Sequence, residues 1–426
     1  MEKIGIIGAG ITGLFSALNL SLDNYDVTLF ERDNLLSGTS GRFHGMLHSG
    51  SRYSLTDENS ARECINENKL LNKNAGNFIK NTSGYFVSLN DDDSSYGDKL
   101  FKKNKNIGIE TENINVNELL KIEPYLNKDI KMALKVPDKI IYAHPFASAV
   151  AMEAILNGAK IRFNSEITGS EIKNKNVISV KYKNGNNIIS EKFDYIINTT
   201  GPWSGKLLKN FNIKNFDIMP TLGYMASYDR LFVNSIINRM RDPSDGDILL
   251  PYGSKSVAGT IAIISEDPDN NELDDEDIDT MISEIAEMVP SIKEYKYKKL
   301  YYSMRPLIKE DNSRNSRDFN IYKNYDNMIT IIGGKFTTSR LMGKSVSEYI
   351  SKIFGNKSSD TKNIIFDNTF NRFISKYKNN IDTSFLDYIN SYDNSMDYEY
   401  KLHIESAFLL NEAVKVNKWN SMENSV

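Results

Sequence analysis

Two histidines and two arginines lie within one short segment rich in glycine and serine, residues 37–53. They are Arg42, His44, His48 and Arg52. Imidazole groups titrate near neutral pH and can move protons, and guanidinium groups bind phosphate or carboxylate through paired hydrogen bonds. The small residues between them let the backbone approach a flat ring system closely. This density of reactive side chains is unusual for a structural loop and predicts a binding or catalytic site.

A glycine motif precedes this segment. Gly8, Gly10 and Gly13 follow the apolar run at residues 3–7, and leucine and alanine recur at helical spacing after them. A second apolar run then ends at Glu31. This order of strand, glycine turn, helix, strand and acid is typical of a dinucleotide-binding βαβ unit, in which the helix start binds pyrophosphate and the acid binds ribose hydroxyls. The motif alone does not distinguish FAD from NAD, but the histidine- and arginine-rich segment after it favours FAD.

The composition excludes several other classes of protein. The chain has 426 residues, of which 40% are hydrophobic, and 52 basic against 56 acidic side chains give a net charge of −4. This length predicts about two to three folded domains. A nucleic-acid partner is not expected, because the charge balance supplies no basic field. The single cysteine, Cys64, excludes internal disulfides, a cysteine-based zinc site and an iron–sulfur cluster held by this chain alone.

Location follows from hydropathy. No apolar run of about 18 residues is present, so we expect no membrane-spanning helix. We expect a cytoplasmic protein, with peripheral association at the inner face of the cell membrane left open. The sequence shows no convincingly basic amphipathic helix that would insert at such a surface.

The remaining elements that position these groups carry weaker signals. Apolar positions between Ala61 and Ile79 predict one long helix, capped by Thr56 or Asp57. Residues 177–182 and 193–198 predict two strands on either side of a turn at 184–187, as in a β-hairpin inserted in an α/β scaffold.

The second half of the chain adds further elements. The acidic residues 266–279 suit a solvated loop and the start of a helix at 281–289, and we assign them no catalytic role. An apolar strand at 328–332 runs into Gly333-Gly334-Lys335 and then a helix at 340–353. Residues 356–426 look polar and helical.

Four segments together resemble the FAD-dependent glycerol-3-phosphate dehydrogenases, which belong to the D-amino-acid-oxidase-like flavoprotein superfamily. They are residues 37–53, 198–204, 305–307 and 333–340. The likeness is closest to the catalytic A subunit of the anaerobic, quinone-linked enzyme. That closer likeness rests on residues 44–53, 60–65 and 238–249. The resemblance covers residues 1–352.

The resemblance implies an α/β fold: a Rossmann-like FAD-binding domain interleaved with an antiparallel-sheet substrate domain, plus a small helical C-terminal appendage. The oxidoreductase part would span residues 1–355 and the helical region residues 356–426. The FAD-binding segments would be about 1–85, 145–215 and 300–355, and the substrate-domain segments about 86–144 and 216–299.

The resemblance also implies roles at the reacting end of the site. His48 matches the family's active-site histidine, and we favour it over its neighbour His44. Arg305 and Lys335 match catalytic or substrate-binding cations, and the following Pro306 fixes the direction of Arg305. The implied substrate contacts are Arg52, Tyr53, Arg317 and Thr338. A solvated loop is the alternative interpretation for Arg317, because it lies in a polar run.

The implied FAD contacts fall in all parts of the resemblance. The glycines and helix start at 333–340 would lie against the flavin ring, where positive charge favours its reduced form. Residue 167 would contact adenine. The full set is Gly8, Gly10, Ile11, Thr12, Gly13, Glu31, Arg32, Thr39, Ser40, Arg42, His44, Gly45, Ile167, Thr200, Gly201, Trp203, Gly334, Lys335, Phe336 and Thr337.

The implied activity is oxidation of sn-glycerol 3-phosphate to dihydroxyacetone phosphate. A hydride would pass to flavin N5, and electrons would then pass to quinone or partner electron-transfer subunits. Three alternatives stay open. A 2-hydroxy acid such as 2-hydroxyglutarate could replace the phosphate ester, because arginine also binds carboxylate. The chain could also be a flavin-binding subunit without catalysis of its own, or an oxidase that uses oxygen.

The sequence departs from the family pattern in three places. Phe43 replaces a smaller or polar residue beside His44, and residues 142–146 differ from the common Val-Asp-Pro run. These changes affect the expected shape of the substrate pocket. The A subunits of the anaerobic enzymes often carry a cysteine-rich extension, which this sequence lacks, so we expect electrons to leave by another route.

Overall fold

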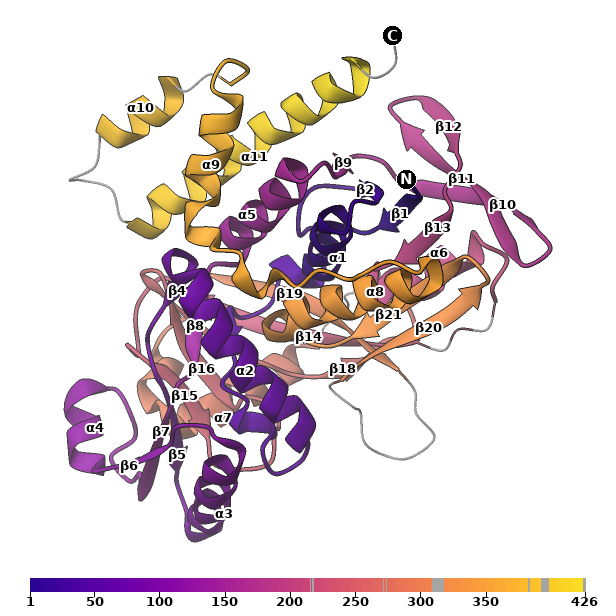
Figure 1. The fold of residues 1–426 in the computed structure, drawn as a ribbon. Helices are drawn as coiled ribbons and strands as arrows, with labels where there is room; N and C mark the ends of the chain where they lie inside the picture. The colour runs from indigo at the N-terminus through magenta and orange to yellow at the C-terminus, as the bar shows by residue number, and fades with distance from the viewer. Residues whose placement is uncertain are drawn as a thin grey trace.

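The computed structural model describes residues 1–214, 216, 218–270, 272, 274–308, 318–381, 384–391 and 398–423. Figure 1 shows two main layers of sheet, with a group of C-terminal helices packed at one end. The described helices are α1 (Ile11–Leu22), α2 (Glu58–Asn74), α3 (Asp91–Ile107), α4 (Val116–Ile122), α5 (Ala143–Leu156), α6 (Ser204–Lys209), α7 (Asp275–Met288), α8 (Ser339–Phe354), α9 (Thr369–Tyr377), α10 (Ser384–Ser391) and α11 (Tyr398–Glu423).

The first sheet is mostly parallel. Its order in the described chain is β20-β21-β13-β1-β2-β9, in which only the β20–β21 pair is antiparallel. Its strands are β1 (Lys3–Ile7), β2 (Asp26–Phe30), β9 (Lys160–Arg162), β13 (Tyr195–Asn198), β20 (Phe319–Tyr325) and β21 (Met328–Gly333). The predicted strand, glycine turn, helix and strand at the N-terminus are confirmed.

The second sheet is largely antiparallel. Its order is β18-β14-β17-β16-β15-β5-β7-β6, and β19 pairs with β14. Its described strands are β5 (Gly84–Ser88), β6 (Glu112–Ile114), β7 (Met132–Val136), β14 (Ile218–Tyr228), β15 (Ile236–Arg239), β16 (Ile248–Tyr252), β17 (Lys255–Gly259), β18 (Ile263–Ile264) and β19 (Lys299–Ile308). Strand β19 therefore belongs to this sheet, although the predicted boundary near residue 300 assigns it to the FAD-binding segments. The other domain boundaries stay a prediction.

Two smaller sheets complete the fold. One is antiparallel and contains β10 (Ile167–Lys173), β11 (Asn176–Asn184) and β12 (Asn187–Glu191). The other contains β3 (Met46–Leu47), β8 (Lys139–Ile141) and β4 (Ile79–Lys80), in that order. The histidine-rich segment is therefore paired through β3 with β8, and β8 pairs with β4.

The hairpin prediction was wrong in its second strand. Strand β11 pairs with β12 across the predicted turn, whereas the apolar run at 193–198 contains β13, which pairs in parallel with β1. A continuous apolar run suits a strand buried on both faces, and all of β13 is buried.

Two helix boundaries also differ from prediction. Asp57 caps α2, since its side chain accepts a hydrogen bond from the Ser60 N–H at 3.0 Å, but the helix ends at Asn74. Phe78 and Ile79 are buried beyond that end, which explains why they extended the apolar pattern. Helix α7 begins at Asp275, so part of the acidic stretch forms its first turn, where carboxylates are favourable.

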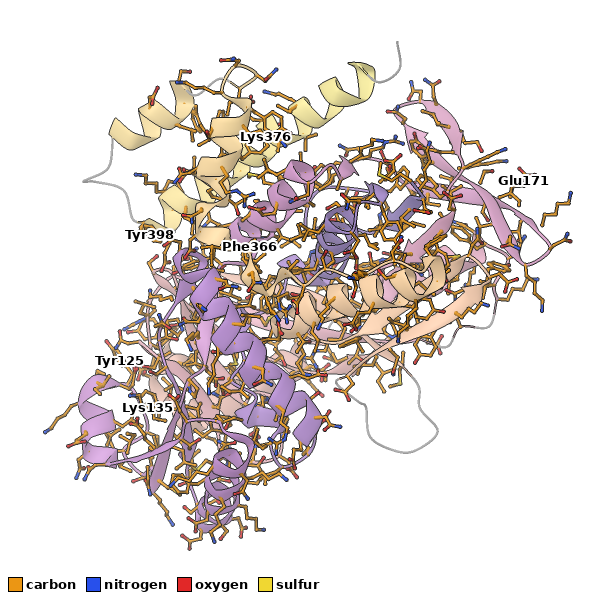
Figure 2. All side chains as sticks on the ribbon, viewed as in Figure 1. Tyr125, Lys135, Glu171, Phe366, Lys376 and Tyr398 are labelled. Atoms are coloured by element: carbon orange, nitrogen blue, oxygen red, sulfur yellow. The ribbon has the colours of Figure 1, made fainter. Side chains whose placement is uncertain are left out.

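The largest apolar core lies around α1, which packs between the parallel sheet and helices α5 and α8. Leu14, Phe15 and Leu18 of α1 are fully buried there. The C-terminal helices join the same core through Phe366, whose ring lies 6.0 Å from that of Phe15 and 5.3 Å from that of Phe146 (Figure 2). A second core lies between the antiparallel sheet and α7.

Candidate active site

A cavity of about 1200 Å³ lies between the parallel sheet and the antiparallel sheet. Its walls include the loops that follow β1, β2, β13 and β21, and residues of β14 and β19. Ligands of open α/β sheets bind outside the carboxyl ends of the parallel strands, so this is the expected position for a dinucleotide. The volume is larger than the roughly 300–1,000 Å³ of ordinary ligand pockets, which fits a long ligand with a substrate beside it.

The glycine turn after β1 forms one wall of the cavity. Gly8 and Gly10 line it, whereas Gly13 does not. A Cβ atom on Gly13 would lie 2.0 Å from the Gly8 carbonyl oxygen, so this glycine lets the helix pack onto the turn. Gly10 precedes α1 and offers no side-chain cap. The Ile11 N–H donates to Ser40 Oγ at 3.2 Å, and the next N–H groups of the first turn can bind an anion.

Glu31 lies at the end of β2 and faces the same turn. Its carboxylate accepts hydrogen bonds from the Ala9 N–H at 2.8 Å and from the Asp33 N–H at 2.9 Å. Two backbone donors fix the carboxylate in one orientation while it still lines the cavity. A fixed carboxylate at this place can accept hydrogen bonds from ribose hydroxyls.

The far end of the cavity is aromatic and partly charged. Trp203 donates a hydrogen bond from Nε1 to Asp269 at 2.6 Å, and the Arg32 guanidinium lies 5.8 Å from the Trp203 ring. Ile167 and Gly201 line the same cavity. Asp269 comes from the acidic stretch that we assigned no catalytic role, and it acts here by orienting the indole.

The turn after β21 forms the opposite wall. Gly333 and Gly334 have φ angles of +92° and +72°, a left-handed conformation that side chains disfavour. Their geometry turns the chain so that the Gly334 N–H donates to the Asp318 carbonyl at 3.1 Å and the Lys335 N–H donates to Thr338 Oγ1 at 3.2 Å. Helix α8 then starts at Ser339.

His48 lies close to this turn and is nearly buried, with 8% of its surface exposed. Its backbone N–H donates to Thr337 Oγ1 at 3.0 Å. Its ring centroid lies 5.4 Å from that of Tyr53 and 5.6 Å from that of His44. His44 accepts the Met46 N–H at Nδ1, at 3.0 Å, so one of its two ring nitrogens is held by the backbone.

The three cations predicted to bind substrate or take part in catalysis that the structure describes, Arg52, Arg305 and Lys335, line the cavity. Lys335 donates to Ser60 Oγ at 2.8 Å, and its Nζ lies 4.8 Å from the centre of the Tyr53 ring. Arg52 donates to the buried carboxylate of Asp247 at 3.1 Å.

Arg305 donates to Thr260 Oγ1 at 2.6 Å. It also lies close to Asp245. Burial raises the pKa of the Asp245 carboxyl, and the charge of Arg305 partly opposes this shift. The arginine therefore has a carboxyl neighbour that is easier to protonate than an exposed aspartate.

Aromatic and polar contacts hold the segment between Thr39 and Gly45. Thr39 donates to the Met304 carbonyl, and the Arg42 guanidinium lies 5.4 Å from the Tyr302 ring centre. Phe43 stacks on Phe336 with ring centroids 4.8 Å apart. Phe43, which differs from the family pattern, therefore makes an aromatic contact between this segment and the turn after β21.

The structure brings most of the predicted residues to one cavity. Those that line it are Gly8, Gly10, Ile11, Thr12, Glu31, Arg32, Thr39, Ser40, Arg42, His44, His48, Arg52, Tyr53, Ile167, Thr200, Gly201, Trp203, Arg305, Gly334, Lys335 and Phe336. Gly13, Gly45, Thr337 and Thr338 lie behind this surface and support it. Arg317 lies outside the described residues.

Sequence reasoning missed several residues of the cavity wall. Thr260 and Asp318 had no signal of their own. Thr260 reaches the site through the pairing of β17 with β14, and Asp318 reaches it through the hairpin of β20 and β21. Asp245 lies within the family-like segment 238–249, which contributed to the resemblance without an assigned role.

Within the described parts of the chain, no group of three or more His, Cys, Asp or Glu side chains could hold a metal ion. No helix in those parts is both long and apolar enough to cross a membrane.

The chain is similar in sequence to known flavoproteins. Residues 3–349 match the model of the family described as "FAD dependent oxidoreductase". The chain is 34% identical over 372 residues to the A1 subunit of the anaerobic glycerol-3-phosphate dehydrogenase of Haloferax volcanii, covering 82% of this chain and 63% of the relative. It is 32% identical over 367 residues to the A subunit of the Escherichia coli K12 enzyme of the same name, covering 82% and 67%. The chain thus spans about two thirds of the length of these relatives.

Solved structures share the fold. The glycerol-3-phosphate dehydrogenase of Bacillus halodurans, complexed with FAD, superposes with a TM-score of 0.72 at 18% identity, covering 97% of this chain and 76% of that one. The L-α-glycerophosphate oxidase of Mycoplasma pneumoniae, with FAD bound, gives a TM-score of 0.70 at 21% identity, covering 86% and 98%. The predicted D-amino-acid-oxidase-like fold and the predicted family resemblance are confirmed.

The residues present fit FAD. The close packing at Gly13, the fixed Glu31 carboxylate and the glycine turn after β21 supply a place for pyrophosphate, ribose and ring at successive parts of one cavity. With the match over residues 3–349, these features show that the chain belongs to the FAD dependent oxidoreductase family and that FAD is its cofactor.

Proposed function

We propose that this chain oxidises sn-glycerol 3-phosphate to dihydroxyacetone phosphate and passes the electrons to quinone or to partner electron-transfer subunits. The observation that carries the proposal is that His48, Arg52, Arg305 and Lys335 line the same cavity as the dinucleotide turn. Relatives at 32–34% identity are named anaerobic glycerol-3-phosphate dehydrogenase subunits, which supports this substrate over others.

The cations would bind the phosphate group. Arg52 lies in the 3₁₀ turn Ser51–Tyr53 and Arg305 lies in β19, but both meet the same loop. Arg52 donates to the Ser244 carbonyl, and the neighbouring Asp245 lies beside Arg305. Guanidinium groups recognise phosphate oxygens through paired hydrogen bonds, and the ammonium of Lys335 adds a point charge. Arg317 and Thr338 stay as proposed substrate contacts.

His48 would take the hydroxyl proton of the substrate. Its ring lies beside Tyr53, and Tyr53 lies beneath the Lys335 ammonium, so proton acceptor and cation flank one aromatic surface. FAD, when bound, supplies the acceptor for the hydride that leaves the carbinol carbon. The near burial of His48 would keep bulk water from competing for the proton.

The cysteine content of the chain limits how electrons leave the flavin. Cys64, the single cysteine of the sequence, is buried in α2, so this chain supplies no set of cysteines for an iron–sulfur cluster. Electrons would therefore pass from the flavin to quinone or to a partner subunit, and transfer to quinone would require peripheral association with the membrane.

An anaerobic reduction assay tests the proposal. The FAD-loaded protein is mixed separately with sn-glycerol 3-phosphate, L-2-hydroxyglutarate and glycerol, and the oxidised flavin absorbance is followed. We expect bleaching by glycerol 3-phosphate and none by glycerol, which lacks the anionic group. Bleaching by 2-hydroxyglutarate alone would transfer the proposal to a 2-hydroxy acid. A flavin that only dithionite bleaches would favour a flavin-binding role without catalysis.

A further inference from the structure

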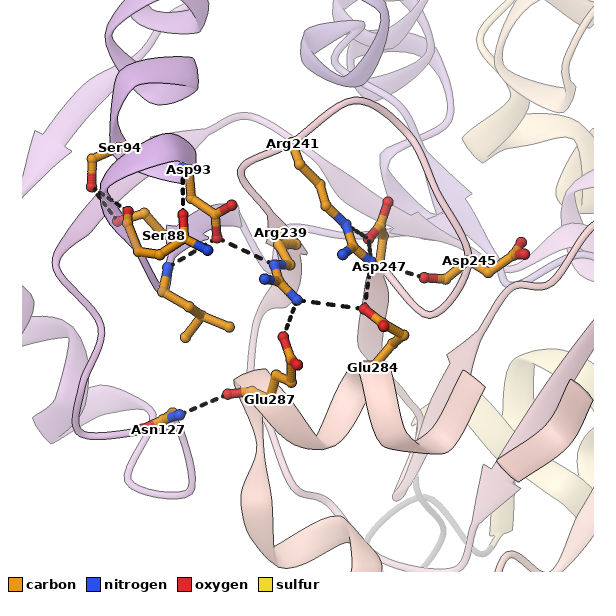
Figure 3. A network of polar contacts seen from close by, with 12 residues as sticks. Ser88, Asp93, Ser94, Asn127, Arg239, Arg241, Asp245, Asp247, Glu284 and Glu287 are labelled. Carbon is orange, nitrogen blue, oxygen red and sulfur yellow. Dashed lines mark hydrogen bonds and ion pairs between the residues drawn. The ribbon is translucent and has the colours of Figure 1, made fainter. Parts of the chain in front are cut away.

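A network of ion pairs around a buried carboxylate lies next to the cavity, and its members other than Arg52 have no role in the function proposed so far. It is centred on the loop between β15 and β16, residues 240–247, and Figure 3 shows it from close by. Asp247 is the fully buried carboxylate of this loop. Its Oδ1 accepts from Arg241 at 2.7 Å, and Arg241 also donates to Glu284 of α7 at 2.8 Å.

The other oxygen of Asp247 faces the candidate substrate site. Oδ2 accepts from Arg52 Nη2 at 3.1 Å and from the Ser244 N–H at 2.5 Å. Arg52 Nη2 makes a second, longer contact of 3.4 Å with the Ser244 carbonyl. Asp247 therefore binds Arg52 directly and also fixes the residue that supplies its second acceptor.

Arg52 has little else to hold it within the described chain. Its side chain is 12% exposed, and its Nη1 is buried without a hydrogen-bond partner among the described residues. Loss of the Asp247 carboxylate would leave the Arg52 guanidinium with one long contact and would leave two partly buried arginines, Arg52 and Arg241, without their shared counter-charge. A desolvated cation in that position would move or draw in water.

We infer that Asp247 is a positioning residue that holds the Arg52 guanidinium in the cavity wall, where it binds the anionic group of the substrate. Arg241 and Glu284 would hold Asp247 from behind and tie this position to α7. The inference rests on the proposed function for the identity of the anion, but the positioning itself concerns any phosphate that Arg52 binds.

The same network contains a matched control. Asp93 is also buried, and its carboxylate accepts a hydrogen bond from Arg239 Nε at 3.2 Å. Asp93→Asn therefore removes the charge of a buried carboxylate that pairs with an arginine, as Asp247→Asn does. Asp93 does not line the cavity formed by the described residues, and Arg239 does not either. A purely structural role for Asp247 would make the two variants behave alike.

A double-mutant cycle tests the inference. Asp247→Asn, Arg52→Ala and the double variant are made in the full chain with FAD bound, and anaerobic flavin reduction gives the half-saturating concentration of sn-glycerol 3-phosphate. We expect Asp247→Asn to raise it about tenfold or more. In the Arg52→Ala background the same change should have no further effect, because Asp247 acts through Arg52. Independent effects in the two backgrounds would overturn the inference, as would an equal effect of Asp93→Asn.

A second readout separates this inference from the proposed function. Inorganic phosphate is titrated into wild type and each variant, and the rise in melting temperature gives its dissociation constant. If glycerol 3-phosphate fails to bleach the wild-type flavin, the proposed function falls, and the phosphate titration still decides the inference. Equal phosphate affinity in wild type and Asp247→Asn, or no phosphate binding by wild type, would contradict it. Asp247→Glu, which keeps the charge, guards against misfolding of the amide variant and should give an intermediate affinity.

Discussion

His48 and Thr337 are 289 residues apart in the sequence, yet the His48 N–H donates to Thr337 Oγ1 at 3.0 Å. Thr337 belongs to the turn after β21, and His48 belongs to the loop that follows β3. Both residues are buried. The bond therefore fixes the candidate proton acceptor against the turn that would contact the flavin ring, and it does so through the backbone N–H of His48, not through its imidazole.

Replacing Thr337 by Val should uncouple these two segments. The variant leaves the buried His48 N–H without its acceptor, at a cost of about 1–3 kcal/mol in unfolding free energy. We also expect slower flavin reduction, because the histidine loses its fixed position. Thr337→Ser keeps the hydroxyl and is the control. Thermal unfolding and stopped-flow reduction measure both effects, and Val and Ser variants that behave alike would contradict this role.

Replacing His48 by Gln should slow the chemical step. A positioned general base contributes roughly 10²–10⁴-fold in rate, so the loss should fall in that range while the flavin content stays constant. His44→Gln should cost less, because one nitrogen of His44 is already held by the Met46 N–H. Single-turnover reduction of both variants gives the comparison. A larger loss for His44→Gln would transfer the proton-accepting role to His44.

Replacing Glu31 by Gln should weaken FAD binding. The carboxylate accepts two backbone N–H groups at 2.8 and 2.9 Å, and charge-assisted hydrogen bonds are stronger than neutral ones. We expect the dissociation constant for FAD to rise about tenfold. Fluorescence titration of apoprotein with FAD measures it. Glu171→Gln, at an exposed position of β10 (Figure 2), should leave it unchanged, and equal affinities in all three proteins would argue against the role of Glu31.

Cys64 should stay unreactive in the folded protein. Burial raises the pKa of its thiol to about 12, so the thiolate is not populated at pH 8. Because the folded state holds the proton more tightly than the unfolded state, this group's contribution to stability is full below an unfolded pKa of about 8.5 and is lost as pH rises towards 12. Ellman titration should detect the thiol only after denaturation. Rapid labelling of native protein at pH 8 would contradict the burial of Cys64.

Local patterns predicted the parts of the site that one short segment encodes. Gly8, Gly10 and Glu31 follow from strand and helix periodicity over about thirty residues, which is the span of a βαβ unit. The predicted pairing of the run at 193–198 was wrong because an apolar pattern indicates that a strand is buried but does not indicate which strand it pairs with.

Residues that meet only through long-range pairing could not be predicted in this way. Thr260 reaches Arg305 after β17 pairs with β14, and β14 pairs with β19. Asp247 lies 195 residues from Arg52 along the chain. Neither contact leaves a periodic or compositional trace, so the sequence indicated the candidate cations of the cavity but not the side chains that hold them.

The most direct test of the central claim is a stoichiometric single turnover with sn-glycerol 3-phosphate under anaerobic conditions. The oxidised flavin absorbance is recorded, and the product is then quantified by an enzymatic assay for dihydroxyacetone phosphate. The account predicts full bleaching with one dihydroxyacetone phosphate formed for each flavin reduced. A flavin that stays oxidised with this substrate, although dithionite reduces it, would contradict the account.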